Sequence, residues 1–121
     1  MREIIFRGKN FCGEWEYGVP VFSGLNNELA FMKQMHSYDH QVIPETVGQY
    51  TGLTDKNSTK IFEGDIVKWG INYTIAFMRA GYVLKKDMNP KMYDYSLMAF
   101  DGTELEVIGN IHDNPELLKG E

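Results

Sequence analysis

The side chains that most often bind metals are few in this chain of 121 residues, which has three histidines and one cysteine. His36, Asp39 and His40 form an H-x-x-D-H pattern. Two imidazoles four residues apart on a helix could hold one metal ion. The neighbouring residues are typical of a polar loop, however, and no fourth ligand is evident. We therefore expect a solvated loop here and no metal site.

Two further patterns could support catalysis, but each has a structural explanation that we favour. Glu63 and Asp65 flank Gly64, and paired carboxylates can exchange protons when burial separates their pKa values. An aspartate between a glycine and a strand more often accepts backbone N–H groups and fixes a corner. Cys12 lies close to two glutamates, whose charge opposes the thiolate that a nucleophile needs. We expect no catalytic residue, no cofactor and no enzymatic activity.

The best candidate for a binding site combines basic and aromatic side chains. They are Tyr82, Lys85, Lys86, Lys91 and Tyr93. A small β-barrel can bind single-stranded nucleic acid by stacking bases on aromatic rings beside positive charge. The same residues could instead form an ordinary hairpin whose aromatic rings point inward. The formal net charge of −5 disfavours nucleic acid, because the mean field of the domain repels a phosphate backbone.

Seven methionines favour a protein partner instead. The methionine side chain adapts to irregular surfaces and is common at protein-binding faces. Most of the seven fall within residues 28–36 and 88–98. We therefore expect these stretches to contribute to a surface for self-association into a homo-oligomer or for another protein.

The elements that must position these side chains are predicted to be short strands. Hydrophobic residues make up 43% of the chain, with seven Tyr, seven Phe, two Trp and 12 Gly, a composition that favours strands over long helices. The length corresponds to one domain, 1–121. We expect about eight or nine strands, with a helical turn near residues 114–118, where Pro115 suits a first helical position.

Three segments carry the sharpest local expectations. Trp15, Tyr17, Val19 and Val21 alternate with other residues, which is typical of a half-buried strand; Pro20 cannot donate to a ladder and indicates an edge or a bulge. Residues 28–36 fit either a helix or a strand, and local propensity favours the helix. Residues 55–58 (DKNS) form a turn whose first aspartate should bond back to the backbone.

Cysteine content and hydropathy bear on the compartment. A single cysteine excludes an intrachain disulfide, so a reducing cytosol is the simplest environment. The N-terminal ten residues lack the long apolar segment of a signal peptide, and no window approaches the roughly 18 apolar residues of a membrane-spanning helix. We expect a cytoplasmic protein that does not bind a membrane.

Three blocks of the sequence resemble the YopX family of bacteriophage and prophage proteins. They are MREIIFRGK with GEWEYG (1–9 and 13–18), PETVGQYTGLTDKNSTKIFEGDIVKW (44–69) and EVIGNIHDNPELL (106–118). The blocks span the chain in the family's order, and the middle block is long enough to be specific. Residues 26–43 and 70–105 match only loosely.

The resemblance adds expectations of its own. It implies a mainly-β fold with a small SH3-like barrel core, an N-terminal β-hairpin extension and a short C-terminal helical turn. It favours a strand over residues 28–36, a bacterial host cytoplasm, and a host or phage protein as a possible partner. It implies no established enzymatic activity, cofactor or catalytic residue. One departure is Ser58, where similar sequences have Gly; either Asn57 takes a positive φ or the turn is strained by roughly 1 kcal/mol.

Overall fold

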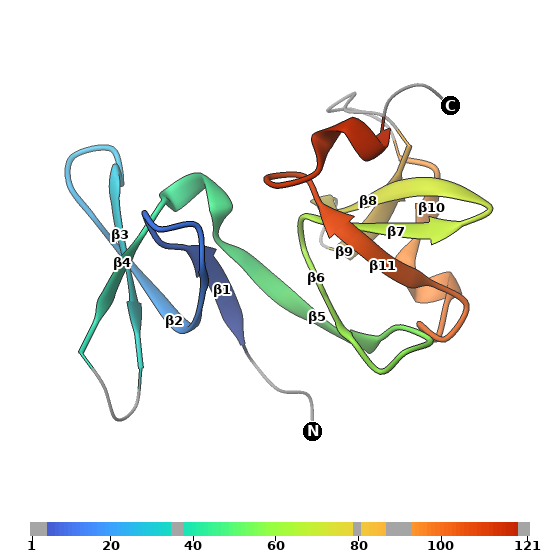
Figure 1. Ribbon diagram of the computed structural model, residues 1–121, viewed down its shortest axis with the longest axis horizontal. Coiled ribbons are helices and arrows are strands. Elements are labelled where there is room, and N and C mark those ends of the chain that lie inside the picture. Colours follow the sequence, from blue (N-terminus) through green and yellow to red (C-terminus); the bar gives the residue numbers. More distant parts are fainter. Residues whose placement is uncertain (1–4, 35–37, 79–80, 87–92, 119–121) are drawn as a thin grey trace. The chain divides into compact units, whose positions relative to one another are not determined.

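The computed structural model describes residues 5–34, 38–78, 81–86 and 93–118. Within these ranges the chain consists of antiparallel strands and short 3₁₀ turns (Figure 1). The prediction of a mainly-β fold is therefore confirmed. The expected domain 1–121 contains two compact units, Met1–Tyr50 and Thr51–Glu121.

The first unit is an antiparallel sheet. Its strands are β1 (Phe6–Lys9), β2 (Trp15–Ser23), β3 (Leu29–Lys33), β4 (His40–Val42) and the part of β5 (Gly48–Thr54) up to Tyr50. They lie in the order β4-β3-β2-β1-β5, and a 3₁₀ turn η1 (Pro44–Thr46) connects β4 to β5. The expected N-terminal hairpin is the pair β1 and β2.

The strand β3 settles the ambiguity over residues 28–36 in favour of a strand. It pairs with β2 on one side and with β4 on the other, and such long-range ladders outweigh a local preference for helix. Ala30, Met32 and Val42 are fully buried and form a small core, against which Phe6 and Val47 pack. Met32 lies within the stretch 28–36 that was expected to contribute to a binding surface, and it belongs to this core instead.

In strand β2 the alternating apolar side chains face solvent, although such alternation suggests that they face the core. Tyr17, Val19 and Val21 are exposed, while Pro20 lies opposite the buried Met32. The cause is cross-strand register, because the residues that β3 places opposite β2 decide which face meets the core. Pro20 pairs with β3 beyond the end of the β1 ladder, which agrees with the edge position expected of it.

The second unit is built around a five-stranded antiparallel sheet of order β10-β9-β8-β7-β11 (Figure 1). Its strands are β7 (Asp65–Trp69), β8 (Ile71–Met78), β9 (Gly81–Lys85), β10 (Tyr95–Ser96) and β11 (Glu106–Asn110). The barrel that the resemblance implies is not closed. The end strands β10 and β11 do not pair within the described residues, and β10 contributes only two residues, so the sheet stays open.

Smaller elements complete the second unit. They are the end of β5 with β6 (Lys60–Phe62), the turn η2 (Leu97–Ala99) and the turn η3 (Pro115–Leu118). The hydroxyl of Thr51 donates to the carbonyl of Ile61 at 2.8 Å between β5 and β6. The amide of Asn72 donates to the carbonyl of Leu117 at 2.8 Å, which anchors η3, the C-terminal helical turn that the sequence predicts.

The core of the second unit lies on one face of this sheet. Its buried side chains are Ile61, Val67, Tyr73, Ile75, Leu84, Leu97 and Leu105. They share one side of the strands, because alternate residues of a strand point to the same face. Ile66, Thr74 and Val83 on the other side are buried as well, so both faces of these strands are covered along part of their length. The corner Glu63-Gly64-Asp65 connects β6 to β7. The Asp65 carboxylate accepts the Phe62 N–H at 2.8 Å. A structural role for Asp65 thus accounts for its place in the sequence.

The turn between β5 and β6 adopts the strained alternative. Ser58 has φ 65°, in the left-handed region, while Asp55 Oδ1 accepts the N–H groups of Asn57 and Thr59, each at 2.8 Å. A side chain at such a φ costs energy because Cβ approaches a carbonyl oxygen.

Replacing Ser58 with glycine is expected to raise the free energy of unfolding by about 0.5–1 kcal/mol, since the strain disappears and only part is lost to backbone entropy. Urea denaturation of the purified chain measures the change. Ser58→Ala is the matched control, because it keeps Cβ and should leave the midpoint nearly unchanged. An equal rise in both variants would show that the gain does not come from φ.

Candidate protein-binding face

One side of the β2–β3 pair presents apolar side chains to solvent, and we call it the outer face. Its apolar members are Tyr17, Val19, Val21, Leu29 and Phe31, and Lys33 lies on the same side, directly opposite Val19. Alternate residues of a strand share a face, and the register places Val21 directly opposite Phe31 and Ser23 opposite Leu29. The opposite side of the same two strands packs on the core formed by Ala30, Met32 and Val42.

The apolar side chains of the outer face are well exposed to solvent. Val19 is 56% exposed, Tyr17 47% and Val21 42%. Single apolar side chains on a surface are ordinary, but neighbours on adjacent strands form a contiguous patch, and such patches mark interaction sites. The geometry can therefore support apolar contact with another protein surface.

Basic side chains lie on and beside the outer face. Lys33 lies 3.8 Å from Asp39 at one end. At the other end, Arg7 and Lys9 of β1 lie over the ring of Trp15, at 3.9 and 4.7 Å from its centroid. Lys33 thus places a positive charge on the face itself, although the whole chain has a net charge of −5.

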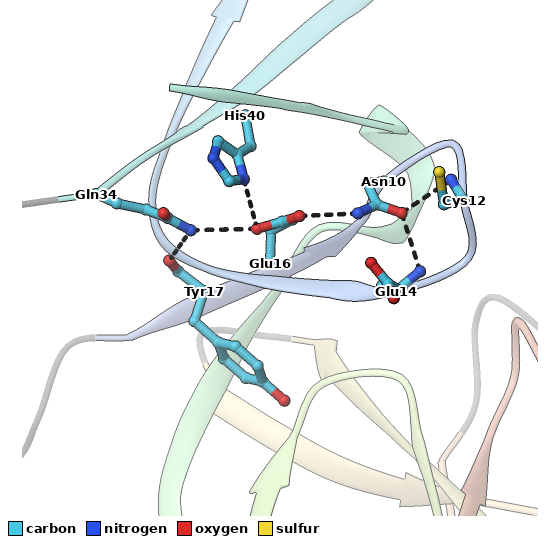
Figure 2. A network of polar contacts seen from close by, with 7 residues as sticks. All are labelled: Asn10, Cys12, Glu14, Glu16, Tyr17, Gln34 and His40. Carbon is cyan, nitrogen blue, oxygen red and sulfur yellow. Dashed lines mark hydrogen bonds and ion pairs between the residues drawn. The ribbon is translucent and has the colours of Figure 1, made fainter. Parts of the chain in front are cut away.

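A polar network adjoins the core side of the same strands (Figure 2). Glu16 of β2 is its centre, and it accepts from Asn10 Nδ2 at 2.8 Å and from Gln34 Nε2 at 3.2 Å. His40 Nδ1 lies 2.8 Å from Glu16 Oε1. Asn10 Oδ1 also accepts the N–H groups of Cys12 and Glu14, both at 2.9 Å. The network ties β4 and the β1–β2 turn to β2.

The electrostatics of this network indicate a structural role. The hydrogen bond from Asn10 holds the pKa of the Glu16 carboxyl below its usual range, against the opposing effect of burial, and His40 and Gln34 contribute in the same direction. An acid whose charged form is stabilised by three donors is a weak proton acceptor. The geometry therefore supports fastening of the sheet rather than acid–base catalysis.

The variant Glu16→Gln tests that role. We expect the free energy of unfolding at pH 7 to fall by about 1–2 kcal/mol, because a charged acceptor of three donors is lost. Since the folded pKa is lowered, the contribution of Glu16 is present above its unfolded pKa and disappears as the pH falls through the folded value. Chemical denaturation at pH 7 and in acid checks both points, with Glu14→Gln as the control. A loss that persists undiminished in acid would contradict the assignment.

The predicted binding residues do not gather into one exposed basic patch in the described part of the chain. Tyr82 is half-buried and packs edge-on against Phe77, with ring centroids 5.1 Å apart. Lys85 is buried and lies opposite Thr74, whereas Lys86 and Tyr93 are exposed. Lys91 lies outside the described residues. The burial of Lys85 leaves less charge for a nucleic acid than the sequence suggested, and the site stays a prediction.

An aromatic cluster in the second unit was not predicted. It contains Trp69, Tyr73, Tyr95 and Phe100, with ring centroids 5.0–6.5 Å apart and mostly edge-to-face. Burial raises the pKa of Tyr73, and Tyr95 and Asp94 add to the effect. The rings contact one another and continue the core along the sheet. The only signal in the sequence was the high aromatic content, because Trp69 and Tyr73 lie far along the chain from Tyr95 and Phe100.

The remaining predicted patterns also have structural positions. His36, of the H-x-x-D-H pattern, lies outside the described residues, while Asp39 and His40 contact Lys33 and Glu16. Among the described residues, no group of three or more His, Cys, Asp or Glu side chains is placed to hold a metal ion. Met98 is 92% exposed, so it keeps the expected surface position that Met32 does not.

Comparison with known proteins gives a family and a fold. A family model described as YopX protein matches residues 6–119. The crystal structure of protein EF1440 from Enterococcus faecalis is similar, with a TM-score of 0.60 and 26% sequence identity over 98% of this chain and 100% of that chain. No curated protein matches the sequence. In the ranges that the structure describes, no helix has the length and apolar character needed to cross a membrane.

Proposed function

Because the chain belongs to the YopX family, we propose that it is a phage- or prophage-encoded accessory protein that acts by binding protein and catalyses no reaction. It works in the cytoplasm of the bacterial host. Its partner is a second copy of the chain or a host or phage protein. The described polar clusters support this proposal, since each has a structural explanation in a turn, a corner or a sheet contact.

The outer face is the observation that carries the proposal. Val19 and Val21 of β2 and Phe31 of β3 present apolar surface on two adjacent strands, while Ala30 and Met32 on the other side are fully buried. Burial of apolar area drives association at roughly 25 cal/mol per Å², before the entropic cost of binding is subtracted. A protein surface is the partner whose chemistry matches this area.

The test is capture of proteins from a lysate of the host bacterium. Immobilised wild-type chain, Val19→Lys and Phe77→Lys are compared by quantitative mass spectrometry. Phe77 is a suitable control because it is 53% exposed on a strand, close to the 56% of Val19. We expect one or more proteins, the chain itself included, to be retained by wild type and Phe77→Lys and lost from Val19→Lys. Identical capture by all three would overturn the proposal.

A further inference from the structure

We propose that the β5–β6 turn (residues 55–58) is an autoinhibitory contact, which keeps a second copy of the chain from pairing its β11 with β11 of the first. Within the described residues, β11 pairs with β7 and with no other strand. We call the side of β11 that points away from β7 the β11 edge. The backbone N–H and C=O groups on such a side form a template for a further strand unless something occupies them.

The turn occupies two successive groups of the β11 edge. The Val107 N–H donates to Asp55 Oδ2 at 2.8 Å, and the Leu105 carbonyl accepts the Lys56 N–H at 3.0 Å. Residues two apart along an extended chain direct their backbone groups to the same side, and an incoming antiparallel strand would bond to these positions. A carboxylate oxygen and one N–H of the turn therefore stand where the groups of another strand would bind.

The far end of the β11 edge is closed in a different way. The register with β7 shifts between Val107 and Gly109, and such an irregularity interrupts the row of groups that a new strand needs. Beyond it, the Asn110 N–H donates to Asn114 Oδ1 at 3.2 Å, and the Asn110 carbonyl accepts the Asn114 N–H at 2.8 Å. Residues 105–107 are therefore the part of the edge that depends on the turn.

The composition of the β11 edge explains why it needs a cover. Residues 105–111 (LEVIGNI) contain one charged side chain, Glu106, and valine and isoleucine favour extended pairing. An uncovered β11 would match β11 of a second copy, because an antiparallel pair of identical strands is related by a twofold axis and forms a closed dimer. At the other end of the sheet, β10 (Tyr95–Ser96) is too short to accept a strand in this way.

Two substitutions uncover the β11 edge, singly and together. Asp55→Ala removes the acceptor of the Val107 N–H. Lys56→Pro removes the donor to Leu105 and keeps the turn, because the Ser58 N–H donates to the Asp55 carbonyl at 3.0 Å, which makes Lys56 the second turn residue, a position that suits proline. Ile75→Ala is the control, since Ile75 is 1% exposed in the core and its truncation destabilises the same unit without changing the edge.

Sedimentation velocity over a concentration series tests the proposal, at a temperature at which circular dichroism shows each variant to be folded. All variants and their parent carry Val19→Lys, so that association through the outer face does not enter the result. The double variant Asp55→Ala/Lys56→Pro should associate at least about tenfold more tightly than the parent, which corresponds to one or two net hydrogen bonds. Amide hydrogen exchange of the double variant should show protection at the Val107 N–H that rises with protein concentration.

Three results would overturn the proposal. Equal association of Ile75→Ala and the double variant would make loss of stability the cause. Association without concentration-dependent protection at Val107 would place the contact elsewhere. A double variant with the mass of the parent would show that the uncovered edge does not accept a strand. If the double variant does not fold, the same criteria apply to Lys56→Pro alone, which retains the Asp55 carboxylate.

Discussion

Replacing Asp55 with alanine is expected to lower the free energy of unfolding by about 4 kcal/mol. The side chain is only 3% exposed, and its Oδ1 atom holds the β5–β6 turn through Asn57 and Thr59. Its Oδ2 atom accepts the N–H of Val107 on β11 at 2.8 Å. Alanine would leave all three N–H groups without this acceptor and remove the side-chain hydrogen bond that joins the turn to β11. Urea denaturation monitored by tryptophan fluorescence measures the loss.

The pH dependence of the same variant identifies the cause. Burial opposes ionisation, but the N–H groups of Val107, Thr59 and Asn57 outweigh it, so the pKa of Asp55 is lowered. A lowered folded pKa stabilises the protein above the unfolded value of about 3.9. The difference between wild type and Asp55→Ala should therefore be full near pH 7 and shrink as the pH falls below about 4.

The matched control for Asp55 is Asp101→Ala. Asp101 accepts the N–H and the hydroxyl of Thr103 in an exposed turn, and within the described part of the chain these bonds are local. Its replacement should cost much less than that of Asp55. Equal losses in the two variants would mean that the bond to Val107 contributes little, and the account of Asp55 would be wrong.

A methyl group added at Gly102 is expected to destabilise the second unit by about 3 kcal/mol. Gly102 has φ 97°, and a Cβ atom there would lie 2.2 Å from the backbone oxygen of Thr54. Because that oxygen belongs to β5, the strand or the turn before β11 would have to move. Thermal unfolding of Gly102→Ala should show a clearly lower melting temperature than wild type.

The control for this substitution is Gly81→Ala. Gly81 begins β9, its φ is not in the left-handed region, and nothing lies within 4 Å of an added Cβ. The same methyl group should therefore change stability little there. A wild-type melting temperature for Gly102→Ala would show that the approach to Thr54 relaxes without cost, contrary to our expectation.

Local features of this fold could be predicted from the sequence because their causes lie within a few residues. Asp55 was expected to bond back to its own turn, and Oδ1 does so. The sharp corner at Gly64 and the terminal turn at Pro115 follow from backbone preferences of single residues. Short strands follow from alternation and from the aromatic and β-branched content.

Features that depend on register could not be predicted in this way. The alternation of β2 was visible, but its pairing with β3 decided that Val19 faces outward and Pro20 faces the core side. Local propensity favoured a helix over residues 28–36, and two neighbouring strands made β3 instead. Lys85 was predicted to bind a ligand, yet it is buried at the end of the β8–β9 ladder, where it pairs with Thr74. A one-residue change of register would reverse each such assignment.

The sequence by itself determined the composition, the turns and the family of this protein, since those depend on residues close together in the chain or on a long matching block. The tertiary structure alone decided which His, Asp and Glu side chains meet, because Glu16 and His40, or Asp55 and Val107, are brought together only by strand pairing. Tertiary structure also created the candidate binding face, because the pairing of β2 with β3 brings their apolar side chains together on one side. The physical reason is that a β-sheet is made by non-local contacts, and no local pattern specifies which face of a strand a distant neighbour will cover.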